Sequence, residues 1–176
     1  NLLLWRDASV DGIKTGHTEE AGYCLVASAQ RDGQRLIAAV FGTDSEAARA
    51  NETAKLLGYG FNFFESKTFF KQGETVQSVD VWKGAASTLK AGVAADFAAA
   101  LPKGTAGAYQ TRVALAAADL VAPVAAGAPL GQIELVDADG KVVMQAPLVA
   151  LETVEAGGFF RRMWDGIRLF FRSLFG

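Results

Sequence analysis

Two apolar runs separated by a short polar turn constrain the fold of this chain more than any other feature. The runs are Tyr23–Ala29 and Arg35–Phe41, both rich in Leu, Val, Ile and Ala, and Asp32-Gly33 lies between them. Asp-Gly between apolar runs is a strong hairpin signal, because glycine accepts the positive φ that a tight turn requires. We therefore expect an antiparallel sheet to which the preceding stretch, Val10–Thr18, adds a third strand.

A helix is expected to follow this sheet. Thr43 and Glu46 have the spacing of a capping box, and Gly58 and Gly60 indicate where the helix ends. Arg49 falls off the apolar face, which would leave it solvated. The apolar residues that recur at helical intervals, and so predict a face packed on the sheet, are Ala47, Ala50, Ala54, Leu57 and Phe61.

The composition changes after residue 65, where short apolar runs alternate with Gly, Pro and polar turns. A spacing near ten residues predicts a small all-β sandwich over residues 66–155. Alanine is a poor strand former, so the alanine-rich stretches Val93–Ala100 and Val113–Ala118 leave short helices open. The expected strands are Gln77–Trp82, Gly92–Ala94, Arg112–Leu115, Gly131–Val136 and Val142–Gln145.

The last segment, residues 156–176, has the pattern of an amphipathic helix. Four arginines and one aspartate form its polar arc, so spanning a bilayer is disfavoured and lying at the lipid interface satisfies both faces. The alternative is a terminal helix packed on the protein's own core; the aromatic residues and the cationic arc favour the membrane. The expected membrane-anchor residues are Phe159, Phe160, Met163, Trp164, Ile167, Phe170, Phe171, Leu174 and Phe175.

Composition excludes several classes of function. A net charge of −2 gives no electrostatic case for binding nucleic acid. The single histidine, His17, has no cluster of Cys or Asp around it, so we expect no metal site. The single cysteine, Cys24, cannot form an internal disulfide.

The expected sheet, helix and β-rich segment together give the fold class α+β, with domains at residues 1–65, 66–155 and 156–176.

The expected first strand carries Lys14-Thr15-Gly16, a triplet shared by serine β-lactamases and penicillin-binding proteins. Lys14 would place a cation beside a nucleophile and a substrate carboxylate, and Thr15 would offer that carboxylate a hydroxyl. Gly16 has no side chain, so a substrate can lie against the strand edge. His17 directly follows and is a candidate for contact with the substrate. A surface lysine before a turn is the plainer alternative.

The flanking sequence resembles the D-alanyl-D-alanine carboxypeptidases among the low-molecular-mass penicillin-binding proteins, of the penicillin-binding protein 5 type. The residues that carry the resemblance are Val10–Thr18, Ala21-Gly22-Tyr23, Leu25–Ala29, Leu56–Phe61 and Phe63-Phe64-Glu65, with the carboxyl-terminal helix. The resemblance implies that residues 1–65 are the carboxyl-terminal part of a β-lactamase/transpeptidase-like domain, an antiparallel sheet plus a helix.

The resemblance also implies a function, one that uses no metal or organic cofactor. A serine would attack peptidoglycan stem peptides ending in D-Ala-D-Ala and release the last D-alanine, and β-lactam antibiotics would acylate the same serine. Lys14 would be catalytic, and Lys14, Thr15, Gly16, His17 and Arg49 would bind substrate, with Arg49 gripping its carboxylate. Anionic membrane lipids would hold the protein at the periplasmic side of the bacterial inner membrane.

One departure from the family concerns the nucleophile. Only Ser87-Thr88-Leu89-Lys90 matches Ser-x-x-Lys, and it follows the Lys-Thr-Gly strand, whereas the family's nucleophile precedes it. We interpret the match as coincidental. No Ser-x-Asn occurs. We therefore expect the carboxyl-terminal part of a longer protein, which supplies one wall of the site and is inactive alone.

Two alternatives stay open. A β-lactamase also carries Lys-Thr-Gly, although the β-rich extension and the terminal helix argue against it. The other alternative is a membrane-tethered, non-catalytic β module that binds or spaces cell-wall partners. Labelling of the full-length parent by fluorescent penicillin distinguishes an enzyme from such a module.

Overall fold

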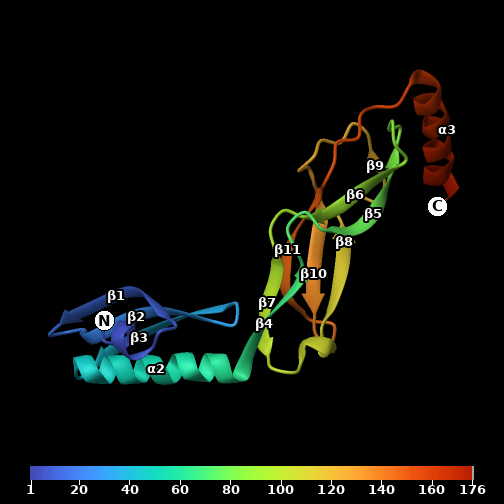
Figure 1. Cartoon of the computed structure of the whole chain (residues 1–176). Coiled ribbons are helices and arrows are strands. Elements are labelled where there is room, and N and C mark those ends of the chain that lie inside the picture. Colours follow the sequence, from blue (N-terminus) through green and yellow to red (C-terminus); the bar gives the residue numbers. More distant parts are fainter. Residues whose placement is uncertain (176) are drawn as a thin grey trace. The chain divides into compact units, whose positions relative to one another are not determined.

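The computed structural model describes the backbone of residues 1–175 and the side chains of residues 1–171. The chain forms two compact units, which Figure 1 colours along the sequence. Unit 1 consists of Asn1–Ser66 together with Ala100–Ala106, and unit 2 consists of Lys67–Ala99 and the chain from Gly107 onward.

A three-stranded antiparallel sheet in the order β1-β2-β3 forms one layer of unit 1. The turn between β2 and β3 has Asp32 at φ 48° and Gly33 at φ 81°, so the predicted Asp-Gly hairpin is confirmed. A one-turn helix, α1 (Leu3–Arg6), precedes β1. The strands are β1 (Val10–Thr18), β2 (Gly22–Arg31) and β3 (Gln34–Thr43).

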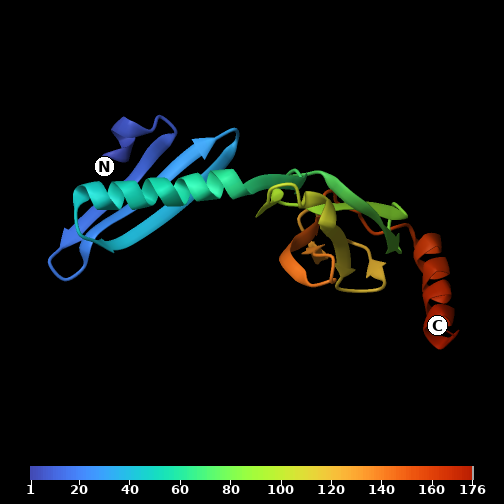
Figure 2. The ribbon, with the colours of Figure 1, turned by 90° about the horizontal axis from the view of Figure 1, so that it is seen from below.

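Helix α2 (Glu46–Phe63) lies across one face of this sheet, as Figure 2 shows. Ser45 caps it, since its hydroxyl accepts the Ala48 N–H at 3.1 Å; the predicted cap at Thr43 is wrong. The predicted end at Gly58 and Gly60 is also wrong, because the helix continues to Phe63. A Cβ at Gly60 would lie 2.5 Å from Leu36 Cδ1, so this glycine lets the helix approach β3 closely.

The buried face of α2 differs from the predicted one. Ala47 and Ala54 are exposed, whereas Arg49, which lies off the predicted apolar face, is only 8% exposed. The buried stripe has i, i+4 spacing, and its polar members are tolerated because each has a hydrogen-bond partner. The stripe consists of Arg49, Ala50, Thr53, Leu57 and Phe61. It packs on a core of strand residues that includes Leu25, Ala27, Ala29 and Ala38.

An ion pair fastens the start of unit 1 to β2. Asp7 accepts hydrogen bonds from Ser9, through both its hydroxyl and its N–H, and from Arg31 Nη2 at 2.7 Å. The Arg31 guanidinium also lies 4.5 Å from the centroid of the Phe61 ring. These hydrogen bonds, those from Ser9 first, hold the pKa of Asp7 below its ordinary value.

Unit 2 is mainly β-structure. Its main sheet has six strands in the order β8-β10-β11-β6-β5-β9, with β5 and β9 parallel. β4 (Phe64–Phe70) pairs with β7 (Phe97–Pro102) in a two-stranded sheet, and a 3₁₀ turn occupies Ala106–Ala108. The strands of the main sheet are β5 (Thr75–Trp82), β6 (Thr88–Val93), β8 (Gln110–Leu115), β9 (Leu120–Val121), β10 (Pro129–Val136) and β11 (Val142–Ala150).

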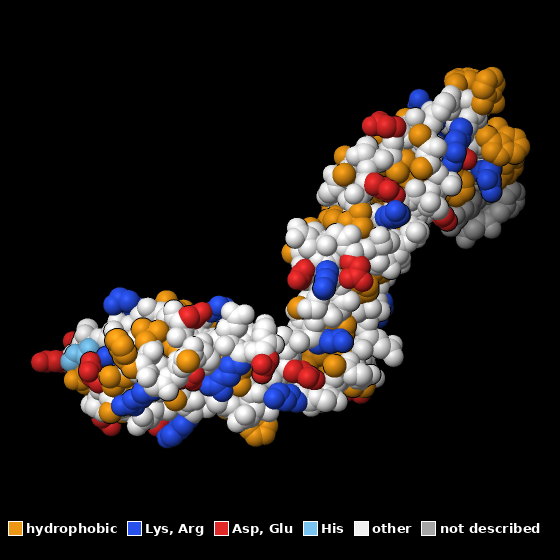
Figure 3. All heavy atoms as spheres, viewed as in Figure 1, with side chains coloured by type: hydrophobic (Ala, Val, Ile, Leu, Met, Phe, Trp, Pro, Cys, Tyr) orange, Lys and Arg blue, Asp and Glu red, His pale blue; other side chains and the backbone are white. Residues whose placement is uncertain are grey.

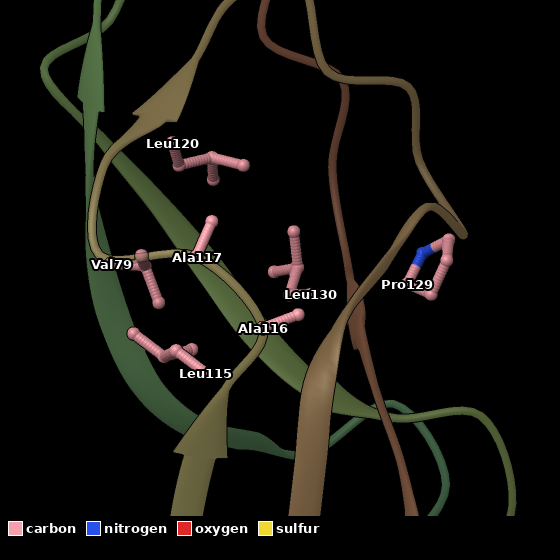
Figure 4. Close-up of a pocket in the computed structure, with 7 residues that line it drawn as sticks. All are labelled: Val79, Leu115, Ala116, Ala117, Leu120, Pro129 and Leu130. Carbon is pink, nitrogen blue, oxygen red and sulfur yellow. The ribbon is translucent and has the colours of Figure 1, made fainter.

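The alanine-rich stretches of unit 2 do not form α-helices. Val93–Ala100 leads into β7, and Val113–Ala118 continues β8 before a turn. Inward-facing residues of β5, β6, β10 and β11 form the core. A cavity of about 60 Å³ lies at the edge of this core. Figure 4 shows the apolar side chains that line it, such as Val79, Leu120 and Leu130. An apolar cavity of this kind offers a charged peptide no partner.

Candidate functional site

The Lys-Thr-Gly triplet lies on β1, at the edge of the sheet of unit 1. Thr15 pairs with Leu25, a core residue beneath α2, so its side chain shares the face that the helix covers. Lys14 pairs with Val26 and starts from the opposite face. Its Nζ turns back to donate to the Thr15 carbonyl at 2.9 Å. The lysine head therefore lies along the backbone of the motif.

Arg49 joins α2 to the same stretch of β1. Its Nη1 donates to the Gly16 carbonyl at 3.1 Å, and its Nη2 donates to Glu46 Oε1 at 2.8 Å. The hydroxyl of Thr53 donates in turn to the Arg49 carbonyl at 2.7 Å, which fixes this turn of the helix. A buried guanidinium with two such partners is held in one position, as recognition of a planar anion requires.

An aromatic pair lies beside this arginine. His17 and Tyr23 face each other across β1 and β2, with ring centroids 3.9 Å apart. The Arg49 guanidinium carbon lies 5.5 Å from the centroid of the Tyr23 ring, within range of a cation–π interaction. Gly16, His17 and Arg49 are thus brought together. Four of the five predicted site residues, Lys14 to His17, thus lie on one short segment of β1, with Lys14 and Thr15 on opposite faces of the sheet, and Arg49 reaches this segment from α2.

Two residues of this arrangement were not predicted from the sequence. Glu46 binds the outer side of the guanidinium, and the i, i+3 spacing from Glu46 to Arg49 was a usable signal for that pair. Tyr23 was assigned only to a strand. Its position opposite His17 depends on the register of β1 and β2, which the apolar pattern alone does not determine.

A carboxylate also lies near the start of β1. Asp11 Oδ2 accepts a hydrogen bond from Arg35 Nη1 at 2.7 Å, and the same Nη1 donates to the Ser28 hydroxyl. The Arg35 guanidinium, followed by the Ser28 hydroxyl, holds the pKa of Asp11 below its ordinary value. The Asp11 carboxylate therefore already forms an ion pair with a residue on a neighbouring strand.

The Ser-x-x-Lys match does not form a nucleophile pair. Ser87 directly precedes β6 and Lys90 lies within it. Side chains three residues apart point to opposite faces of a strand, whereas the same spacing on a helix would bring them together. The interpretation of this match as coincidental is therefore supported.

Helix α3 (Phe159–Phe175) exposes its apolar face. Figure 3 shows hydrophobic side chains gathered over the described part of this helix. Phe160 is 79% exposed and Trp164 62% exposed, and Phe159, Met163, Ile167, Phe170 and Phe171 are exposed as well. The side chains of Leu174 and Phe175 lie outside the described residues. Seven of the nine expected anchor residues thus form one open apolar surface, and they do not pack on a core of unit 2.

The opposite stripe of α3 contacts the turn after β5. Arg161, Asp165 and Arg168 lie one turn apart along this stripe, so part of the cationic arc faces the protein itself. The contacts are Asp165 Oδ2 with the Lys83 N–H at 2.8 Å, Arg161 Nη1 with the Ala85 carbonyl at 3.5 Å, and the Arg168 guanidinium carbon 5.8 Å from the centroid of the Trp82 ring.

Among residues 1–175, no helix combines the length and the hydropathy needed to cross a membrane. No group of three or more His, Cys, Asp or Glu side chains within the described part of the chain is arranged to hold a metal ion.

Residues 64–156, slightly more than half of the chain, match the family described as "Penicillin-binding protein 5, C-terminal domain". Residues 1–45 match the family described as "D-alanyl-D-alanine carboxypeptidase". Both matches point to one class of protein, the penicillin-binding D-alanyl-D-alanine carboxypeptidases.

Individual relatives agree with these matches. The D-alanyl-D-alanine carboxypeptidases DacC and DacA of Escherichia coli K12 are each 40% identical over 177 residues, which cover 100% of this chain and 44% of either relative. The crystal structure of penicillin-binding protein 5 from Haemophilus influenzae superposes with a TM-score of 0.80 at 37% identity, over 87% of this chain and 45% of that one. The chain therefore belongs to the penicillin-binding protein 5 family, and it spans less than half the length of these relatives.

Proposed function

We propose that this chain is the carboxyl-terminal part of a membrane-anchored, serine-type D-Ala-D-Ala carboxypeptidase of cell-wall biosynthesis. Its substrates are peptidoglycan stem peptides ending in D-Ala-D-Ala, and β-lactam antibiotics occupy the same site. Unit 1 supplies the wall that grips the substrate, and the serine nucleophile comes from outside the sequence described here. The chain alone is inactive.

The observation that carries the proposal is the buried Arg49 guanidinium bound to the Gly16 carbonyl of the Lys-Thr-Gly strand. In the proposed mechanism, Arg49 and the Thr15 hydroxyl bind the terminal carboxylate of the peptide, and the peptide lies along the bare edge at Gly16. Lys14 is the catalytic cation beside the nucleophile, where it favours the serine alkoxide that attacks the carbonyl of the scissile bond. His17 lines the same edge.

Fluorescent penicillin tests this assignment. We expect the full-length parent to be labelled and the 176-residue chain to remain unlabelled. In the parent, Lys14→Ala is expected to abolish labelling, whereas Lys55→Ala should label normally, because Lys55 forms an exposed pair with Glu52 on α2. Absence of labelling in an intact, folded parent would favour a non-catalytic cell-wall module instead.

The proposed anchor is residues 156–176, with the small all-β domain of residues 66–155 between it and the catalytic domain. The exposed aromatic residues of α3 enter the acyl boundary of a bilayer containing anionic lipids, without spanning it. The protein would then be a peripheral protein of the bacterial inner membrane, on the periplasmic side. Removal of residues 159–176 is expected to move the parent from the membrane pellet to the soluble fraction, and continued pelleting would exclude α3 as the anchor.

A further inference from the structure

Helix α3 is fixed to unit 2 by its polar stripe, through a turn with an unusual backbone. Lys83, which follows β5, has φ 57°, a left-handed conformation that is uncommon for residues other than glycine. Both of its backbone groups are used: its N–H donates to Asp165, and its carbonyl accepts the Gly157 N–H at 2.8 Å. The turn therefore binds the helix and the segment before it at a single residue.

A hollow of about 230 Å³ lies between this stripe and the end of the β5–β6 hairpin. Arg161 and Arg168 line it from the helix side, one on each side of Asp165. Trp82 and the Ser87 side chain line it from the hairpin side. The hollow thus combines two guanidinium groups, an indole and a hydroxyl.

Two guanidinium groups on the lining of the hollow are available to an anion. The lining carries two arginines, Arg161 and Arg168, and two carboxylates, Asp165 and Asp80. One of the carboxylates, Asp165, already accepts the Lys83 N–H. Guanidinium groups bind phosphate oxygens through paired hydrogen bonds, which gives geometric specificity as well as energy.

The position of the hollow indicates the source of that phosphate. It lies on the polar side of a helix whose other side exposes Phe160 and Trp164. If those aromatic residues enter the acyl boundary, the polar stripe lies at the depth of the headgroups, where tryptophan is also favoured. We propose that this hollow binds the phosphate of an anionic phospholipid headgroup through Arg161 and Arg168, with Trp82 and Ser87 as its opposite wall. The proposal rests on the membrane anchoring proposed above.

The test compares binding of the 176-residue chain to vesicles of phosphatidylcholine alone and of phosphatidylcholine mixed with phosphatidylglycerol. The measured quantity is the ratio of the two affinities, for the wild type and for Arg161→Gln, Arg168→Gln and Arg162→Gln. Arg162 is the matched control: it carries the same charge on the same helix but lies outside the hollow. Circular dichroism verifies that each variant keeps its helix.

General attraction to an anionic surface is worth about 5-fold per arginine, and we expect Arg162→Gln to lower the ratio by about that factor. Loss of charge-assisted hydrogen bonds to a seated phosphate should lower it by about 20- to 100-fold for Arg161→Gln and for Arg168→Gln. Equal effects of all three substitutions would show a diffuse cationic face and overturn the proposal.

Two further outcomes separate this site from the anchor and from free phosphate. A chain that binds neither type of vesicle refutes the anchor itself, whereas binding without preference for phosphatidylglycerol refutes only the headgroup site. Saturable binding of inorganic phosphate in the absence of vesicles, lost in Arg161→Gln, would assign the hollow to a soluble anion and contradict the lipid proposal.

Discussion

Truncation of one exposed aromatic residue on α3 should weaken membrane binding by a predictable amount. Phe160 is 79% exposed. A phenylalanine offers about 200 Å² of surface, so about 160 Å² is open, and about half of it enters the acyl region when the helix lies in the interface. At about 25 cal/mol per Å², Phe160→Ala then costs about 2 kcal/mol, or about 30-fold in vesicle affinity.

Co-sedimentation with anionic vesicles measures this loss, and alanine preserves the propensity of the helix. Phe41→Ala is the matched control, since Phe41 is 70% exposed but lies on β3 of unit 1. We expect its affinity to equal that of the wild type. Equal losses for the two variants, or no loss for Phe160→Ala, would refute the assignment of the apolar face of α3 to the bilayer.

Three further predictions concern stability. The pKa of Asp7 is lower in the folded protein than in the unfolded chain, where it is about 3.9. The contribution of Asp7 to stability is therefore complete above that unfolded value and is lost as the pH falls through the folded value. In Asp7→Asn, hydrogen exchange of the β2 amides should depend less on pH below about pH 4 than it does in the wild type. Gly92→Ala should destabilise unit 2 by about 2–3 kcal/mol in urea unfolding, because a Cβ there would lie 2.3 Å from the Glu74 carbonyl oxygen. Gly107→Ala is the control and should be nearly neutral, because a Cβ at Gly107 would meet open space. Ser45→Ala should cost unit 1 about 1 kcal/mol through loss of the α2 cap, and an unchanged urea midpoint would argue against that cap.

The sequence predicted those parts of the fold that depend on local pattern. The Asp32-Gly33 turn determines its hairpin through backbone preference alone, and the amphipathic arc of α3 follows from its 3.6-residue period. The expected strands at β5, β8 and β10 were found for the same reason, because turn residues separate them. The expected strand Gly92–Ala94 covers only the end of β6, and β4, β7 and β9 were not predicted. The alanine-rich stretches were the exception, because their composition left the secondary structure open. The alanines of β7 lie in a strand because β7 pairs with β4, although alanine has a low intrinsic preference for strands.

Features that depend on long-range contacts could not be predicted in this way. Arg49 lies off the predicted apolar face of α2, and its burial depends on a partner that the helical pattern does not reveal, a carbonyl on β1, 33 residues earlier in the chain. Likewise, the charge pattern of α3 did not distinguish arginines that face lipid from those that face the protein. The contact of Asp165 with the Lys83 N–H, 82 residues away, makes that distinction.

Recognition of a substrate carboxylate at the Arg49–Gly16 contact is the central claim, and one pair of peptides tests it directly. The parent enzyme and its Arg49→Ala variant are assayed for kcat/KM on a peptide ending in D-Ala-D-Ala and on the same peptide with an amidated carboxyl terminus. A charge-assisted hydrogen bond to the carboxylate is worth about 1.5–3 kcal/mol, so the parent should prefer the free acid by about 10- to 150-fold. We expect Arg49→Ala to lower only the rate on the free acid and to remove this preference. A preference that survives intact in Arg49→Ala would contradict it.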